Sequence, residues 1–266
     1  FKPGDHLIID ADLYGGSIRL FDNVSSKNGI HFSRIDCWKE NVESYVNKNT
    51  KAIYIETPTN PMMNVTDIAA LAEIAKYNDR IVALDADLSK STKSADFKKE
   101  YPDRFFNAGI AEANMIGMAA GMAASGLIPF ASTFAMFAAG RAFEQIRNSV
   151  AYPKMNVKIV GSHSGITVGE DGATHQAIED ISLMRSIPNM VVINPCDATE
   201  TAAAVKAAAE YNGPVYIRTG RMAVEDLHEN GCSFEIGKGE VLRDGDSLAI
   251  VATGICVKMA LDAAEE

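Results

Sequence analysis

The chain has 266 residues, of which 47% are hydrophobic and 23% are charged, and its formal net charge is −10. This composition is typical of a soluble globular protein with a sizeable core. The acidic balance without a basic stripe excludes nucleic acid as an expected partner, and no run approaches the roughly 18 apolar residues of a membrane span, so no membrane contact is expected.

Cysteines are few and far apart. Their spacing contains no C-x-x-C pair, so it favours neither a zinc site nor a disulfide framework and fits a reducing compartment. We therefore expect a cytoplasmic protein without a metal site of its own. The chain opens on Phe1 without a signal-peptide pattern and stops inside a helix-like segment at Glu266, so both ends are expected to be cut.

Short apolar runs alternate with longer segments of helical character along the whole chain. This alternation predicts an α/β fold in which βαβ units build parallel sheets. The predicted strands are His6–Asp10, Ile30–Asp36, Ala52–Thr57, Ile81–Ala86, Ile128–Thr133, Val157–Ser162, Met190–Pro195 and Pro214–Thr219.

Two longer segments, 111–125 and 198–211, are predicted helices. Each is followed by a glycine, Gly126 or Gly213, which is the usual residue after the last helical turn. Asp197 is the predicted N-cap of the second helix, since an Asp side chain accepts hydrogen bonds from the first free backbone N–H groups.

The tail of the chain has a different character. Within Glu240–Gly254 the pair Asp244-Gly245 predicts a hairpin turn that precedes a buried strand. We expect this tail to be the start of a further domain.

Two motifs occur in the first part of the chain at a specific spacing. They are DLYGGSIR, which contains Tyr14, and ETPTNP, which contains Asn60. Residues 1–76 resemble the Cys/Met-metabolism family of pyridoxal-phosphate enzymes, such as cystathionine synthases and lyases. The resemblance implies that Tyr14 stacks on the pyridine ring and that Asn60 lies near the ring hydroxyl.

The other parts of a pyridoxal site are missing from the sequence. That chemistry needs a Schiff-base lysine, an acid opposite the pyridine nitrogen and a phosphate cradle. Asp85 and Lys93 imitate the acid and the lysine, but they are much closer in sequence than the family pattern requires. We therefore expect no pyridoxal phosphate to bind, and Tyr14 and Asn60 to be vestigial.

Three further motifs follow in order between Gly109 and Gln176, namely GIAEAN, PFASTFAMF and GEDGATHQ. With LDADLSKST at 84–92, they resemble the C-terminal subunit of a split transketolase over residues 81–266, above all its pyrimidine-binding domain. The resemblance implies thiamine diphosphate with Mg²⁺ as cofactor. It also implies an N-terminal partner subunit that holds the diphosphate and the metal, because the Gly-Asp-Gly signature of that second domain does not occur here.

The resemblance assigns the cofactor side of the site to four residues. Glu112 is the acid beside the pyrimidine ring nitrogen, and its apolar neighbours in sequence would desolvate a carboxyl, which suits a proton-sharing role. Phe134 and Phe137, three residues apart, would hold the pyrimidine between neighbouring rings, although two phenylalanines are otherwise more often core residues. Asp87 is also implied to contact the cofactor.

The substrate side is assigned in the same way. His163 and His175 are implied to be catalytic and to contact the sugar, and Asp171 to hydrogen-bond a hydroxyl of the donor. Ser91 and Arg218 match positions that hold the terminal phosphate, a role that suits a hydroxyl and a guanidinium fork. A second arginine of the family has no counterpart, so this phosphate clamp is expected to be incomplete.

The chain is thus interpreted as a join, near residues 76–80, of two incomplete proteins. The expected parts are a pyridoxal-enzyme fragment at 1–80, a pyrimidine-binding domain at 81–222, and a linker with the truncated start of a further domain at 223–266. The expected function is transfer of two-carbon ketol units between sugar phosphates, as in pentose phosphate metabolism. We expect a homo- or hetero-oligomer that is inactive without its partner.

Two alternatives stay open at the level of sequence. The chain could be a fragment of a pyridoxal-phosphate lyase or synthase, or a noncatalytic chimeric scaffold. Related thiamine enzymes, including deoxyxylulose-phosphate synthase and dehydrogenase β subunits, share the role of Glu112, but the order of acid, glycine and histidine in GEDGATHQ favours a transketolase.

Overall fold

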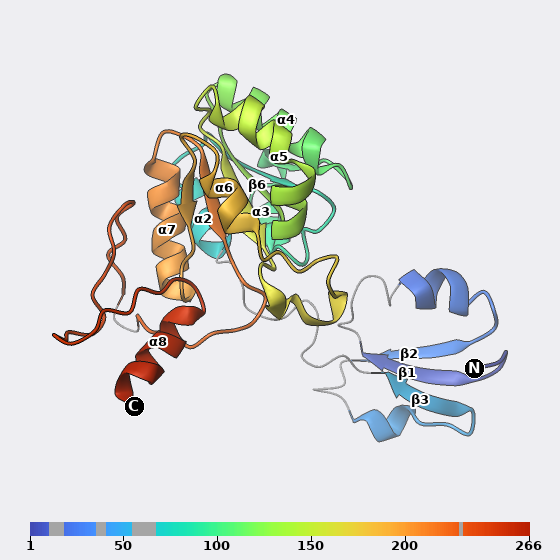
Figure 1. The fold of residues 1–266 in the computed structure, drawn as a ribbon. Coiled ribbons are helices and arrows are strands. Elements are labelled where there is room, and N and C mark those ends of the chain that lie inside the picture. The colour runs from blue at the N-terminus through green and yellow to red at the C-terminus, as the bar shows by residue number, and fades with distance from the viewer. Residues whose placement is uncertain (11–18, 36–40, 55–67, 229–230) are drawn as a thin grey trace. The chain divides into compact units, whose positions relative to one another are not determined.

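The computed structural model describes residues 1–10, 19–35, 41–54, 68–228 and 231–266, with the side chains of Asp10 and of 68–70 left aside. The chain divides into two compact units, Phe1–Met63 and Asn64–Glu266, and each is described by itself (Figure 1).

The first unit contains a parallel sheet of strands β1 (His6–Asp10), β2 (His31–Ile35) and β3 (Thr50–Tyr54), in the order β2-β1-β3. Two short helical turns, η1 (Phe21–Ser25) and η2 (Val42–Tyr45), accompany the strands. Leu7, Ile9 and Phe21 form a small core. The side chain of His6 bonds Thr50 Oγ1 at 2.8 Å and Ser33 Oγ at 2.9 Å, so it ties all three strands together.

The second unit is built on a six-stranded sheet in the order β5-β4-β6-β7-β9-β8, and every pair of neighbours is parallel. Its strands are β4 (Ile81–Asp85), β5 (Phe105–Asn107), β6 (Ile128–Phe134), β7 (Lys158–Ser162), β8 (Val191–Ile193) and β9 (Val215–Arg218).

Helices cover both faces of this sheet. Along β4 the side chains alternate between the faces, so that Ile81 and Ala83 join one apolar cluster and Val82 and Leu84 join another. The first cluster is covered by α2 (Ile68–Ala75), α3 (Ser94–Glu100) and α7 (Ala198–Glu210). The second is covered by α4 (Glu112–Ala124), η4 (Phe137–Arg141), α5 (Phe143–Gln145), η5 (Ile146–Ala151) and α6 (Asp180–Arg185).

Three further elements lie between or after these layers: η3 (Pro102–Arg104), η6 (Ile166–Asp171) and α8 (Cys256–Glu265). The expected α/β fold with parallel sheets is thereby confirmed. Both predicted long helices form, as α4 and α7, and the Asp197 side chain accepts a hydrogen bond from Glu200 N at 2.7 Å, as an N-cap does. Across the described part of the chain, we find no helix with the length and apolar character that a bilayer crossing requires.

Helix α2 packs within the second unit. Tyr101 donates to Ala72 O at 3.3 Å and Arg104 donates to Ala75 O at 3.1 Å, while Leu71 lies in the same core cluster as Phe97. The division between the compact units, at Met63/Asn64, therefore lies upstream of the boundary near residue 80 that the sequence resemblance suggested.

Two expectations differ from the structure. Strand β5 was not predicted, because its only apolar residues are Phe105 and Phe106, whereas the equally short β8 lies within a longer apolar run. The hairpin at Asp244-Gly245 was wrong: residues 240–254 contain no strand, and Leu248 and Val251 are 80% and 94% exposed. A run of apolar residues forms a buried strand only where a sheet edge or a second layer is available to cover it.

Candidate functional site

The candidate site lies at the carboxyl edge of the six-stranded sheet. Strand β4 is flanked by β5 on one side and β6 on the other, so successive strands are added first on one side of β4 and then on the other. Ligands of parallel sheets usually bind in the crevice at such a switch point. Five predicted site residues end or follow strands of this sheet. Asp87 and Ser91 follow β4, Phe134 ends β6, His163 follows β7 and Arg218 ends β9.

Glu112 is the first residue of α4. A turn at Gly109, with φ of 72° and a 2.7 Å hydrogen bond from Ala111 N to Gly109 O, sets where the helix begins. A carboxylate in the first helical turn is favoured by the helix dipole. Its side chain is 6% exposed, and Arg141 Nη1 donates a 2.9 Å hydrogen bond to Glu112 Oε1. The sequence predicted only apolar neighbours for Glu112, and the structure shows that the cationic side chain of Arg141 also contacts it.

Arg141 also covers one of the predicted aromatic residues. Its guanidinium carbon lies 4.0 Å from the centroid of the Phe137 ring, in cation–π contact. Both residues belong to η4, a π-helical turn, and such turns occur frequently at functional sites. Sequence reasoning missed Arg141. Its position four residues after Phe137, on the same side of a helical turn, was the available signal.

Four aromatic side chains contact one another, and Arg141 links them to Glu112. The Phe134 and Phe137 rings are stacked, with centroids 5.7 Å apart and planes at 19°. The His163 ring stacks on Phe134 at 4.1 Å, and the His175 ring meets Phe137 edge-on at 5.1 Å. Contacts therefore run without a break from Glu112 through Arg141 and the aromatic rings to both histidines.

His163 is held in an unusual environment. It follows β7 with a φ of 56°, a left-handed conformation that non-glycine residues rarely adopt and that is concentrated at functional sites. Burial, with the positive charge of Arg221 and the proximity of His175, lowers its pKa to about 3. The imidazole is therefore neutral at physiological pH, and its Nδ1 lies 3.1 Å from Ser162 Oγ.

Arg221 binds the loop that carries Asp171 through two residues of that loop, Val168 and Glu170. Arg221 Nη2 pairs with Glu170 Oε1 at 2.6 Å, and Arg221 Nη1 donates to Val168 O. Burial raises the pKa of Asp171, while Arg221 and His175 oppose this shift. Arg221 is itself 6% exposed, and nothing in the sequence motifs indicated this role.

Arg218 is oriented by a buried acid. Its Nε donates to Asp180 Oδ2 at 2.8 Å, and the same oxygen accepts a hydrogen bond from Tyr216 at 2.9 Å. Among the described residues no hydrogen bond joins Arg218 to Ser91, which is half-buried. Asp87 is exposed in a left-handed conformation, and its backbone N–H donates to Asn107 Oδ1 at 3.2 Å. The structure thus places these three residues at the same sheet edge without direct mutual contacts.

Tyr14 and Asn60, the two predicted pyridoxal-site residues, lie outside the described residues. Lys93, which imitates the Schiff-base lysine, adopts a left-handed conformation with φ of 63° directly before α3.

Two family profiles match the chain. The transketolase pyrimidine-binding domain matches residues 67–226, and the Cys/Met metabolism PLP-dependent enzyme family matches residues 1–94. The first match contains every element of the six-stranded sheet, together with the site residues from Asp87 to Arg218. The second match covers the first unit and overlaps the start of the first match.

Similar proteins carry the same family name. The "Putative transketolase C-terminal section" of Methanocaldococcus jannaschii is 60% identical over 197 residues, which are 73% of this chain and 62% of the relative. The 6-deoxy-6-sulfo-D-fructose transketolase subunit SqwH of Clostridium sp. MSTE9 is 46% identical over 201 residues, or 76% of this chain and 62% of the relative. The chain thus spans less than two thirds of either relative.

One solved structure is similarly close. A structure described as "Split gene transketolase, inactive beta4 tetramer" superposes with a TM-score of 0.68 at 57% identity, and the match covers 74% of this chain and 64% of that one. Fold similarity and sequence similarity cover the same part of the chain. The chain therefore belongs to the transketolase family through its pyrimidine-binding domain.

Proposed function

We propose that the chain is the C-terminal half of a thiamine-diphosphate-dependent transketolase. The observation that carries this proposal is the buried Glu112, which Arg141 links to the stacked Phe134 and Phe137 rings, with His163 and His175 against the same rings. A carboxylate next to flat apolar rings suits a flat heterocycle that carries a ring nitrogen.

The residues present fit the pyrimidine end of the cofactor. Within the described ranges, the clusters of His, Cys and carboxylate groups that could hold a metal lie at 196–197 and 228–240, away from Glu112 and the aromatic rings in sequence. We therefore infer that a partner subunit holds the diphosphate and Mg²⁺.

The cofactor, when bound, supplies the carbon nucleophile that accepts a two-carbon unit and passes it on. In this proposal Glu112 holds the proton that it shares with a pyrimidine ring nitrogen. Arg141 already donates to Oε1, and the other carboxylate oxygen, Oε2, makes no hydrogen bond to a described residue. The ion pair would thus fix the carboxylate while Oε2 receives the ligand.

The substrate is proposed to be a sugar phosphate. His163 is neutral at physiological pH and can donate a hydrogen bond to sugar oxygens or accept one from sugar hydroxyls. His175 lies close enough to act electrostatically on both His163 and Asp171. Arg218 would offer a charged donor to the phosphate, with Ser91 as a second polar group. Asp87 is proposed to contact the cofactor.

The isolated chain is proposed to be inactive and to assemble with a transketolase N-terminal subunit. The 57% identical structure is that of a split gene transketolase, described as an inactive β4 tetramer, and this relationship supports both parts of the proposal. A cytoplasmic location stays a prediction.

Reconstitution tests the function. The purified chain is mixed with a transketolase N-terminal subunit, thiamine diphosphate and Mg²⁺, and ketol transfer between sugar phosphates is followed. We expect activity only in the complete mixture, and a Glu112→Gln variant should lose about 10²- to 10⁴-fold in kcat. Glu210→Gln, at an exposed helix end, is the matched control and should retain full activity. Equal activity of both variants would contradict the role of Glu112.

We further infer that segments of two protein families are joined near residues 76–80. The sequence motifs give the position of the join, and the support for two segments is that the profiles match 1–94 and 67–226, which overlap only at 67–94, and that the structure forms two compact units divided at Met63/Asn64. Sequencing the source nucleic acid across codons 60–100 tests the join. A continuous read through this interval would show that the join exists in the source gene, and reads that end or change partner there would contradict it.

A further inference from the structure

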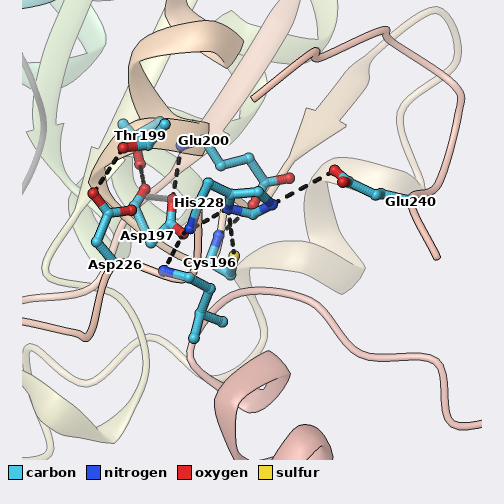
Figure 2. Close-up of polar contacts among 9 residues, drawn as sticks. Cys196, Asp197, Thr199, Glu200, Asp226, His228 and Glu240 are labelled. Atoms are coloured by element: carbon cyan, nitrogen blue, oxygen red, sulfur yellow. Dashed lines mark hydrogen bonds and ion pairs between the residues drawn. The ribbon is translucent and has the colours of Figure 1, made fainter. Parts of the chain in front are cut away.

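A second group of polar side chains lies after the pyrimidine-binding domain, around His228. Residues 222–228 and 231–255 contain no helix or strand. Segments of this length without secondary structure usually carry a function or need an additional constraint to become ordered. Among the described residues of this stretch that carry an ionisable side chain, His228 is buried, with 9% of its surface exposed, and its contacts are shown in Figure 2.

The acid Asp197 fixes the His228 ring. Asp197 Oδ2 lies 2.6 Å from His228 Nδ1 and also accepts the backbone N–H groups of Leu227 at 2.8 Å and His228 at 3.1 Å. Its other oxygen caps α7 through Glu200 N. Because an ionised carboxylate only accepts hydrogen bonds, we assign the proton of the neutral ring to Nδ1, so Nε2 carries the free lone pair.

The free nitrogen faces two further potential ligands. Glu240 Oε2 lies 3.5 Å from His228 Nε2, on the side of the ring away from Asp197 (Figure 2). The ligand atoms of His228, Cys232 and Glu240 all lie within 4.8 Å of one another. Two ligands bound tetrahedrally to Zn²⁺ at its usual bond lengths are about 3.3–3.8 Å apart, so a small closure of this group would bring three ligands to the metal and leave the fourth position to water.

We propose that His228 Nε2, Cys232 Sγ and a Glu240 oxygen form a zinc site. A nitrogen, a thiolate and a carboxylate oxygen are the donors that Zn²⁺ prefers, whereas Mg²⁺ takes oxygen donors. Two anionic ligands and one neutral ligand balance the charge of the ion. A buried carboxylate that holds the second nitrogen of a ligating histidine is the usual support of such a site, and Asp197 occupies that position.

The other side of the ring is a poorer site. Cys196 Sγ lies 4.0 Å from His228 Nδ1, and Cys196, Asp197 and His228 also form a compact group. Both Asp197 oxygens already accept N–H donors there, and a metal would have to displace the cap of α7. The ligands of the proposed site are therefore those on the side of the free Nε2, namely Cys232 and Glu240.

A cysteine nucleophile is the competing interpretation, because Cys232, His228 and Asp197 occur in the order of a catalytic triad. Burial, and then the charges of Glu200, Glu240 and Asp197, raise the pKa of the Cys232 thiol. These carboxylates disfavour an isolated thiolate, whereas a bound cation compensates them. Zinc would anchor the irregular segment to α7 through His228 and Asp197, so binding should also stabilise the fold.

Cobalt substitution tests the proposal on the full-length chain. Titration with Co²⁺ should give one ion per chain, a thiolate-to-cobalt charge-transfer band and the visible bands of tetrahedral coordination. Zn²⁺ should displace the cobalt and remove these bands. Cys232→Ser should abolish the charge-transfer band. Glu240→Gln removes a ligand, so it should weaken Zn²⁺ binding by at least the roughly 10- to 100-fold that is typical for loss of a group that only supports a ligand.

Cys256→Ser, on the exposed face of α8, and Cys196→Ser are the matched controls and should keep the band. Circular dichroism without metal verifies that each variant is folded. Loss of the band in Cys196→Ser with its retention in Cys232→Ser would overturn the assignment. Absence of thiolate coordination in the parent chain would also overturn it, and rapid labelling of Cys232 by iodoacetamide that Zn²⁺ does not slow would favour the nucleophile instead.

Discussion

Arg141 and Glu112 form an ion pair that joins the two halves of the candidate cofactor site. Nη1 of Arg141 lies 2.9 Å from Oε1 of Glu112, although the residues are 29 positions apart in sequence, and the same guanidinium covers the Phe137 ring at 4.0 Å. One side chain thus orients the acid and supports an aromatic wall. Loss of Arg141 should therefore affect both stability and cofactor recognition.

We expect Arg141→Ala to lower the free energy of unfolding by about 1–3 kcal/mol, because it leaves a buried oxygen of Glu112 without its donor. Urea unfolding of the isolated chain measures the change. Arg147→Ala, which removes an exposed arginine bonded to its neighbour Asn148, is the control and should change stability little.

A double-mutant cycle isolates the pair itself. Arg141→Ala combined with Glu112→Gln should show a coupling free energy of about 0.5–3 kcal/mol. Strictly additive effects would mean that Arg141 contributes through its packing on Phe137 alone.

Arg218→Lys tests the proposed phosphate contact in the reconstituted enzyme. The Arg218 Nε is engaged by Asp180, so only a forked guanidinium can bind this acid and a phosphate together. We expect the KM for a phosphorylated ketol donor to rise about 10- to 100-fold, the size of a lost charged hydrogen bond, with little change in kcat. Arg185→Lys, at an exposed position of α6, is the control. An equal rise in KM for an unphosphorylated donor would argue against a phosphate contact.

The fold followed from the sequence wherever a pattern is local. Strand β6 and helix α4 were predicted because an apolar run, or a helical pattern closed by a glycine, lies within one segment. The tail failed for the opposite reason: a hairpin needs a neighbouring sheet, and residues 240–254 have none. Local turn chemistry therefore predicted a strand that tertiary structure does not support.

The site was predictable only in part. The motifs indicated Glu112 and Phe137, whereas Arg141 resembles a solvent-facing residue until the fold brings it to Glu112. His228 and Cys232 do not have the spacing of a zinc motif. Their juxtaposition depends on Asp197, which lies 31 positions before His228 and was recognised only as a helix cap.

Gly161→Ala tests how the sheet positions the substrate side. A Cβ at residue 161 would lie 2.2 Å from the Tyr216 hydroxyl and 2.7 Å from Cζ of its ring, so the ring must move. That hydroxyl bonds Asp180, which in turn holds Arg218. We expect a loss of about 1–3 kcal/mol in the free energy of unfolding, measured with urea.

Gly117→Ala is the matched control, since a Cβ there meets no atom within 4 Å and the residue lies inside α4. Alanine should raise the stability by about 0.5–1 kcal/mol at such a position. If both substitutions stabilise the chain, the close packing of Tyr216 against Gly161 is not a constraint on the fold.

The final prediction concerns pH and His163. Its pKa of about 3 in the folded chain, set by burial and then by Arg221 and His175, lies below the ordinary value of 6.5. The unfolded chain takes up a proton below pH 6.5 and the folded chain does not. The stability that the neutral ring provides is therefore complete above pH 6.5 and is lost progressively as the pH falls towards 3.

Between pH 7 and pH 5 this loss should reach at most about 2 kcal/mol, because one pKa unit corresponds to about 1.4 kcal/mol. Urea unfolding at both pH values measures it in the parent chain and in His163→Gln, which has no group to titrate. The carboxylates contribute to the pH dependence of stability in both proteins, so the quantity compared is the change in the free energy of unfolding between pH 7 and pH 5. We expect the parent to lose more stability than the variant on acidification, and equal losses would show that His163 becomes protonated without unfolding.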